Sequence, residues 1–236
     1  MSTGTAPRAA SAATAVRPPK PVLSQRAERE LSARHREVLD ALERTFLVDG
    51  FRKATVGGLA ATVGCSRRTL YELARSKHDL VLLVLDRFLH RVGRTALDGI
   101  DPTAPYTEQV RRYFVGAVEL QRRTSAFADD LADDPAARRL FDRHFRYVVS
   151  VIERLVHEGI TAGELRPVSP AIVAAVFAGS GLYALESDVL DDLDVTREDA
   201  TTEIADLIVQ SLQLEHPSPP STATAADTSS QLNRSR

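Results

Sequence analysis

The sequence is poor in cysteine, methionine and tryptophan. Among its 236 residues there is one cysteine, one methionine and no tryptophan. A single cysteine excludes an intramolecular disulfide framework and fits a reducing compartment. Uninterrupted apolar runs, such as residues 80–85 and 171–178, are far shorter than the roughly 20 residues that a membrane-spanning helix needs. The N-terminus also has no continuous apolar segment of the secretory type, so we expect a cytoplasmic protein with no membrane partner.

Acidic residues are absent from residues 1–27, and this marks a strong asymmetry of charge along the chain. Lysine and arginine give residues 1–94 a net charge of +8, whereas residues 95–236 carry −10, although the whole chain is nearly balanced at −2. A basic first part favours contact with a polyanion at that end, and the acidic remainder indicates a different task.

Both ends of the chain also lack large apolar residues. Residues 1–30 begin with an Arg-, Ser- and Ala-rich stretch containing four prolines, and residues 216–236 have a similar polar composition. Such segments bury too little surface to offset the entropy of ordering, so we expect a disordered basic arm over 1–30 and a disordered tail over 216–236. The arm either enters a minor groove of DNA or is a solvated extension, and its composition favours the extension.

Between these tails the apolar residues recur at helical spacing, and no strand or hairpin pattern is convincing. The spacing predicts an all-α fold of about nine helices, in which a three-helix helix-turn-helix domain with its connecting helix (31–94) precedes a larger C-terminal helical domain (95–215). The expected helices cover residues 31–48, then two short helices capped by Thr55 and Ser66, then 77–97, 106–123, 125–132, 135–159, 169–187 and 197–214. Gly50 is placed to end the first, Thr55, Ser66 and Ser76 to begin the next three, and Pro135 fits a first turn after Asp134.

The most informative stretch is Val56–Arg75, VGGLAATVGCSRRTLYELAR. Its apolar residues fit two short helices, with the small Ala60 where the helices would cross and Gly64 where the chain would turn. This is the sequence pattern of a helix-turn-helix, whose second helix enters the major groove. The arginines of that second helix can bind guanine edges or phosphates, although a helix pair with a solvated charged face would show the same pattern.

With its flanks, this stretch resembles the TetR family of bacterial transcriptional regulators. The resemblance implies an all-α homodimer that binds double-stranded DNA at a palindromic operator, usually as a repressor that a small-molecule effector releases. It rests on Gly50-Phe51, Thr55-Val56, Leu59-Ala60, Val63-Gly64, Ser66, Thr69-Leu70-Tyr71, Ser76-Lys77-His78-Asp79-Leu80 and the later Gly163-Glu164-Leu165-Arg166-Pro167. The positions that it places near DNA are Thr55, Ser66, Arg67, Arg68, Thr69, Tyr71, Glu72 and Lys77. Gly58, Arg68, Leu73 and Ala74 depart from the family pattern, so the operator sequence does not carry over.

The aromatic residues of the helices that follow are candidates for an effector pocket. With one histidine as a polar anchor, the candidates are Phe88, Tyr113, Phe114, Phe127, Phe141, His144, Phe145 and Phe177. The six histidines show no HxH or HxxxH spacing, so we expect no metal and no cofactor. Cys65 belongs to the apolar pattern of the turn, which favours a small core residue over a thiol sensor.

The last two helices have more apolar surface than a terminal helix pair needs, which favours a dimer face in a four-helix arrangement. Its expected residues are Ile172, Val176, Phe177, Ser180, Leu182, Ile204, Leu207, Ile208 and Ser211. Burial of these residues within one chain is the alternative.

Three classes of function were compared. An enzyme is disfavoured because no nucleophile–base pair, carboxylate pair or metal set emerges from the helical patterns. A ligand-responsive dimeric repressor is favoured, and a dimeric DNA-binding activator or architectural regulator without an effector is the alternative.

Overall fold

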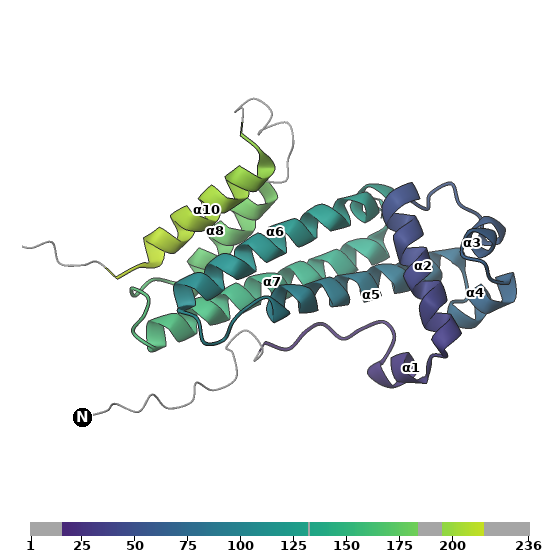
Figure 1. Cartoon of the computed structure of the whole chain (residues 1–236), viewed down its shortest axis with the longest axis horizontal. Helices are drawn as coiled ribbons and strands as arrows, with labels where there is room; N and C mark the ends of the chain where they lie inside the picture. The colour runs from purple at the N-terminus through teal and green to yellow at the C-terminus, as the bar shows by residue number, and fades with distance from the viewer. Residues whose placement is uncertain (1–15, 132, 184–194, 215–236) are drawn as a thin grey trace, which may run out of the picture.

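The computed structural model describes residues 16–131, 133–183 and 195–214, and within them the regular structure is entirely helical (Figure 1). This confirms the all-α prediction. The helices of these residues are α1 (Gln25–Glu30), α2 (Ala33–Asp49), α3 (Val56–Thr62), α4 (Arg67–Leu73), α5 (Lys77–Asp98), α6 (Tyr106–Leu131), α7 (Pro135–Thr161), α8 (Pro170–Tyr183) and α10 (Arg197–Leu212).

The three long helices α5, α6 and α7 pack side by side along the long axis of the molecule (Figure 1). Helices α2, α3 and α4 lie at one end of this bundle, and α8 and α10 pack on α6 at the other. Buried apolar side chains form two hydrophobic clusters, one at each end. The first cluster joins α2–α5 to Leu131, at the C-terminal end of α6, and to Leu140, near the N-terminal end of α7. These two ends of α6 and α7 therefore support the helix-turn-helix end of the molecule.

Most helix boundaries follow from local chemistry that the sequence predicts. Thr55, Ser66 and Ser76 each accept a hydrogen bond from a backbone N–H of the first turn of α3, α4 and α5, respectively. Gly50 ends α2 with φ +68°, a backbone conformation that costs glycine little. Asp134 caps α7 with Pro135 in its first turn, as expected.

Two expectations about local structure are wrong. Residues 106–123 and 125–132 were expected to form two helices, but α6 is continuous to Leu131, because no glycine or proline interrupts it there. Residues 16–30 were expected to be disordered, yet Ser24 caps the short helix α1 and the Val22 N–H donates to the buried carboxylate of Asp86 at 2.7 Å. A tertiary hydrogen bond therefore fixes a segment whose composition alone favours disorder. The expected tails over 1–15 and 215–236 lie outside the described residues.

No helix among the described residues combines the length and the hydropathy that a bilayer-crossing segment requires.

Gly159 of α7 lies where an added side chain would meet tightly packed neighbours. A Cβ atom built there would lie 2.7 Å from Leu165 Cγ and 2.9 Å from Tyr106 Cβ, two atoms close to their own backbones. We expect Gly159→Ala to lower the free energy of unfolding by about 1–3 kcal/mol, the usual cost of overpacking a core.

Gly116→Ala in α6 is the matched control, because its Cβ would meet Ala96 at an ordinary 3.7 Å. There we expect a gain of up to about 1 kcal/mol, since alanine favours the helix. Urea unfolding followed by circular dichroism measures both, and equal stability of the two variants would contradict the packing argument.

Candidate nucleic-acid interface and cleft

Helices α3 and α4 have the compact geometry of a helix-turn-helix. Leu59, Ala60 and Leu70 are buried between the two helices and the rest of the first hydrophobic cluster. Gly64 turns the chain with φ +65°, and the N–H of Cys65 donates to the carbonyl oxygen of Ala60. Because Leu70 is buried, the opposite side of α4 is left to solvent.

Cys65 contributes to this packing. Its side chain is half-buried against the first cluster, and burial raises the pKa of its thiol. A thiol with a raised pKa is less ionised and less reactive at neutral pH. These features support the interpretation of Cys65 as a small core residue.

Four of the residues expected near DNA are solvent-exposed on α4: Arg67, Arg68, Tyr71 and Glu72; Tyr71 has 54% of its surface accessible. The Arg67 guanidinium lies over Gly57 of α3, where a Cβ would approach it to 2.8 Å. Gly57 therefore leaves room for this arginine, a role that helix propensity could not reveal.

Other expected residues already have partners within the chain. The hydroxyls of Thr55 and Ser66 are helix caps, and Thr69 Oγ1 lies 2.9 Å from Ser66 Oγ. The Lys77 ammonium donates to the carbonyl oxygen of Arg52 at 3.1 Å. These four side chains hold the motif together, and any contact that they make with DNA is additional to that role.

Glu72 carries a negative charge that would repel a phosphate backbone. Arg68 Nε donates to it at 3.1 Å, and His35 Nε2 of α2 lies 3.3 Å from its other oxygen. The hydrogen bond from Arg68, followed by that from His35, lowers the pKa of Glu72 below its ordinary value. The carboxylate thus stays charged and orients Arg68.

The structure adds basic residues that the motif alone did not single out. Arg34 of α2 donates to the carbonyl oxygen of Gly64 in the turn at 2.5 Å, and Lys53 is exposed just before Thr55. Asp130 at the end of α6 accepts from the backbone N–H groups of Phe51 and Arg52, which fixes this loop. In the sequence, Arg34 and Lys53 contributed only to the net positive charge of residues 1–94, and no motif marked them.

The residues expected to form one effector pocket do not lie together. Tyr113, Phe114 and Phe177 pack on one another inside the second cluster, whereas Phe88 belongs to the first. Phe141 and Phe145 are half-buried, and the side chain of Phe127 lies outside the described residues. Helical periodicity marks these aromatics as buried but cannot tell at which end of a long bundle each is buried.

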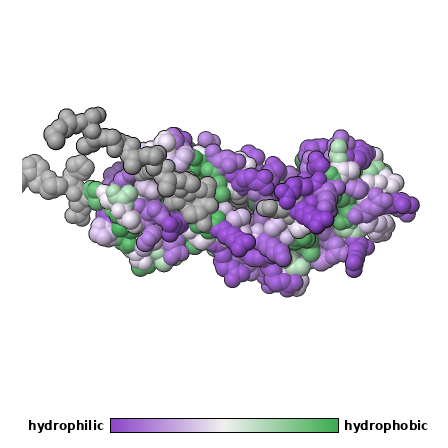
Figure 2. Space-filling view, turned by 90° about the horizontal axis from the view of Figure 1, so that it is seen from below, coloured by the Kyte–Doolittle hydropathy of each residue, from purple (hydrophilic) through white to green (hydrophobic). Residues whose placement is uncertain are grey.

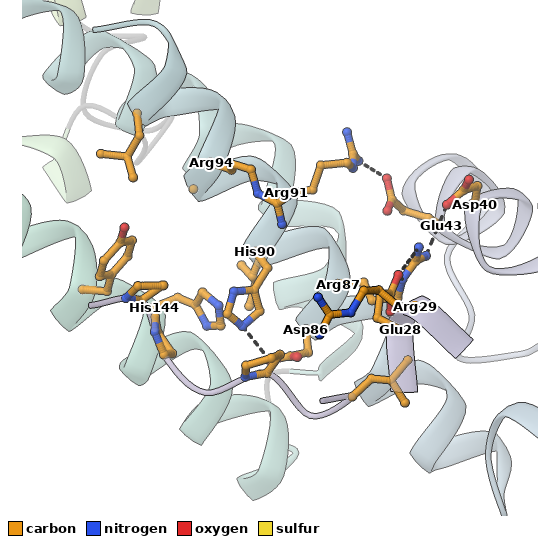
Figure 3. A pocket seen from close by; sticks show the side chains of 18 residues that line it. Glu28, Arg29, Asp40, Glu43, Asp86, Arg87, His90, Arg91, Arg94 and His144 are labelled. Carbon is orange, nitrogen blue, oxygen red and sulfur yellow. Dashed lines mark hydrogen bonds and ion pairs between the residues drawn. The ribbon is translucent and has the colours of Figure 1, made fainter. Parts of the chain in front are cut away.

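A cleft of about 610 Å³ lies elsewhere, between the N-terminal segment and helices α2, α5 and α7 (Figure 3). His144 is the one expected pocket residue that lines it. Its outer wall carries ion pairs: Arg87 lies 2.9 Å from Glu28 and 3.2 Å from Asp40, and Arg91 pairs with Glu43. Burial raises the pKa of Glu43 despite Arg91 beside it.

The inner wall of the cleft holds Asp86, His90 and His144. Asp86 is 1% exposed, and besides the Val22 N–H it has Arg143 Nη2 at 3.4 Å. Burial lowers the pKa of both histidines. These neutral imidazoles and the buried carboxylate are the polar groups that a molecule in the cleft would meet.

Some residues of the expected dimer face are exposed to solvent, and others are buried in the core of the chain. Three apolar side chains of this face are exposed: 65% of Ile172, 55% of Val176 and 59% of Leu207 is accessible to solvent. Ser211, one helical turn after Leu207, is also exposed. Ser180 and Ile204 are half-exposed, whereas Phe177 and Ile208 are buried within the chain. The side chain of Leu182 lies outside the described residues. The exposed apolar residues of α8 and α10 are thus the part of the list free to meet a second copy.

No family model matches the sequence. Its curated relative is an uncharacterized helix-turn-helix transcriptional regulator, YhgD of Bacillus subtilis strain 168. The two are 22% identical over 149 residues, which cover 61% of this chain and 78% of the relative.

Solved structures give a closer view of the architecture. A TetR/AcrR-family regulator from Thermobifida fusca superposes with a TM-score of 0.60 at 16% identity, over 75% of this chain and 97% of its own. A protein from Saccharomonospora viridis in complex with choline, described as a transcriptional regulator, gives 0.62 at 18%, over 78% and 100%. The fatty acid degradation regulator FadR of Bacillus halodurans gives 0.59 at 12%, over 76% and 96%. These neighbours are transcriptional regulators and not enzymes. The fold of this chain is therefore the fold of TetR-family transcriptional regulators.

Proposed function

We propose that the protein is a dimeric, sequence-specific DNA-binding regulator of transcription in the bacterial cytoplasm. The observation that carries the proposal is the exposed side of α4, where Arg67, Arg68 and Tyr71 face solvent beside a turn built by Gly64. Such a helix fits the major groove, where arginine can bind guanine O6 and N7. Figure 2 shows that hydrophilic side chains predominate over the end of the molecule that α1–α4 form.

The dimer is proposed to form through the exposed apolar side chains of α8 and α10. A two-fold axis that passes this face and runs along the bundle would place two copies of α4 at one side of the pair, and the operator would then be palindromic. The choline-bound and FadR neighbours support a small molecule as effector of this architecture.

The cleft beside α5 is the proposed effector site. Helix α5 begins at the end of the helix-turn-helix, and its Asp86 and His90 line the cleft. A molecule that prefers one position of α5 relative to α7 would change the spacing of the two α4 helices, and so release the repressor by its differential affinity for the two states.

In vitro selection of DNA bound by the full chain tests this proposal. We expect enrichment of sites made of two inverted half-sites whose centres lie one turn of DNA, about 34–36 Å, or a multiple of it apart. A selection that enriches no sequence would rule out sequence-specific recognition, and enrichment of single half-sites would rule out the symmetric dimer.

A further inference from the structure

Three side chains of metal-binding types meet on the inner wall of the cleft. Asp86 and His90 stand one helical turn apart on α5, and His144 faces them from α7 (Figure 3). One ligand atom from each residue lies within 4.8 Å of the other two. The His90 and His144 rings are 4.7 Å apart and nearly perpendicular, at 82°.

Each histidine has a buried ring nitrogen that makes no hydrogen bond to any residue the structure describes. His144 Nδ1 donates to the carbonyl oxygen of Leu140 at 2.9 Å, which makes Nδ1 the protonated nitrogen and leaves a lone pair on Nε2. His144 Nε2 and His90 Nε2 are buried and lack a hydrogen-bond partner among the described residues. The distance from His90 Nε2 to Asp86 Oδ1 is 3.7 Å, too long for a hydrogen bond. Orphaned buried polar atoms are rare, and two of them beside a buried carboxylate call for an explanation such as a bound ion.

We propose that Asp86, His90 and His144 bind a divalent first-row transition metal ion of the zinc class. Two imidazole nitrogens and one carboxylate oxygen suit Zn²⁺, and three protein ligands leave a fourth position open toward the cleft. The bond from His144 Nδ1–H to a backbone carbonyl is the outer contact that metal-ligating histidines usually have. Bonds of about 2.0–2.2 Å require the ligand atoms to draw closer together than they are without metal.

Arg143 competes with the ion for Asp86. Its Nη2 lies 3.4 Å from Asp86 Oδ1, but its side chain is 40% exposed and can turn toward solvent. Because the ligands combine an Asp–x–x–x–His pair with a histidine 54 positions later, the histidine spacing alone did not reveal the cluster.

Titration of the chelator-treated full chain with Zn²⁺ by calorimetry, and with Co²⁺ by visible absorption, tests the site without any use of DNA. We expect one ion per chain and a higher Tm with metal. The variants Asp86→Asn, His90→Gln and His144→Gln each remove a ligand, and we expect each to weaken binding at least tenfold. His157→Gln, at an exposed histidine on α7, is the matched control and should bind like the parent chain.

Absence of binding by the parent chain, or equal binding by the ligand variants and the control, would overturn the proposal. Circular dichroism of the metal-free variants checks their folding. If His144→Gln does not fold, the metal affinity of His90→Gln tests the proposal, since His90 is less buried than His144 and its replacement should disturb the fold less. Metal binding is measured without DNA, and operator binding is measured by a separate selection. A negative result in one experiment therefore does not decide the other proposal.

Discussion

Replacing Arg67 and Arg68 together by alanine is expected to weaken operator binding by at least about 100-fold, because each half-site loses one arginine–base contact, which contributes roughly 1–3 kcal/mol, and one arginine–phosphate contact. Both guanidiniums are exposed on α4, one over Gly57 and the other paired with Glu72. Fluorescence anisotropy with an operator obtained by selection measures the change.

The single variants separate base recognition from phosphate contact. Loss of a base contact relaxes the sequence preference at one position of each half-site, whereas loss of a phosphate contact weakens binding to all sequences. In the second case the slope of log K against log salt concentration falls by about 0.9 per contact. Since Glu72 orients Arg68, we assign base recognition to Arg68 and phosphate contact to Arg67.

Arg112→Ala is the control for the double variant. Arg112 pairs with Glu108 one helical turn away on α6, as Arg68 pairs with Glu72 on α4, and both pairs are exposed. Its loss removes an equivalent ion pair and positive charge at a distance from the helix-turn-helix, and operator affinity should not change. A double variant that binds as tightly as this control would exclude α4 as the recognition helix.

The second large effect is expected at the opposite end of the molecule. Replacing Val176 and Leu207 by glutamate should convert the proposed dimer to a monomer and raise its dissociation constant at least about 100-fold, since unpaired charges would be buried at the interface. A two-fold axis doubles the effect because each substitution occurs on both sides of the interface. Sedimentation equilibrium measures the association, and the monomer should lose tight operator binding because it reaches one half-site.

Val48→Glu provides the comparison for this variant. Val48 of α2 is 82% exposed, more than Val176 or Leu207, but it lies at the other end of the bundle. Its substitution should leave self-association intact. A double glutamate variant that remains dimeric would show that the two copies meet through another surface.

Local chemistry made much of the fold predictable. The caps at Thr55, Ser66 and Ser76 and the left-handed turns at Gly50 and Gly64 depend on residues within four positions of one another, so the sequence pattern contains the whole interaction. The same holds for the apolar spacing that buries Leu59 and Leu70 and leaves Arg67 and Arg68 exposed. The roles assigned to these residues in DNA binding remain predictions.

Contacts distant in sequence were not predictable in this way. The bond from the Val22 N–H to Asp86 orders a segment of low hydropathy, and it joins residues 64 positions apart. The aromatic residues show the same limit, since Phe88 and Tyr113 have similar periodic surroundings but lie in different clusters.

By itself, then, the sequence determined an all-helical chain with a helix-turn-helix near its basic end, because capping, turn geometry and helical periodicity act over one or two turns. The tertiary structure decided what those helices bring together: Glu72 between Arg68 and His35, a cleft closed by the N-terminal segment, and His144 opposite Asp86 and His90. Each of these groups includes residues from more than one helix, and the distances between helices depend on how α2, α4, α5 and α7 pack, which residue spacing along one helix does not specify.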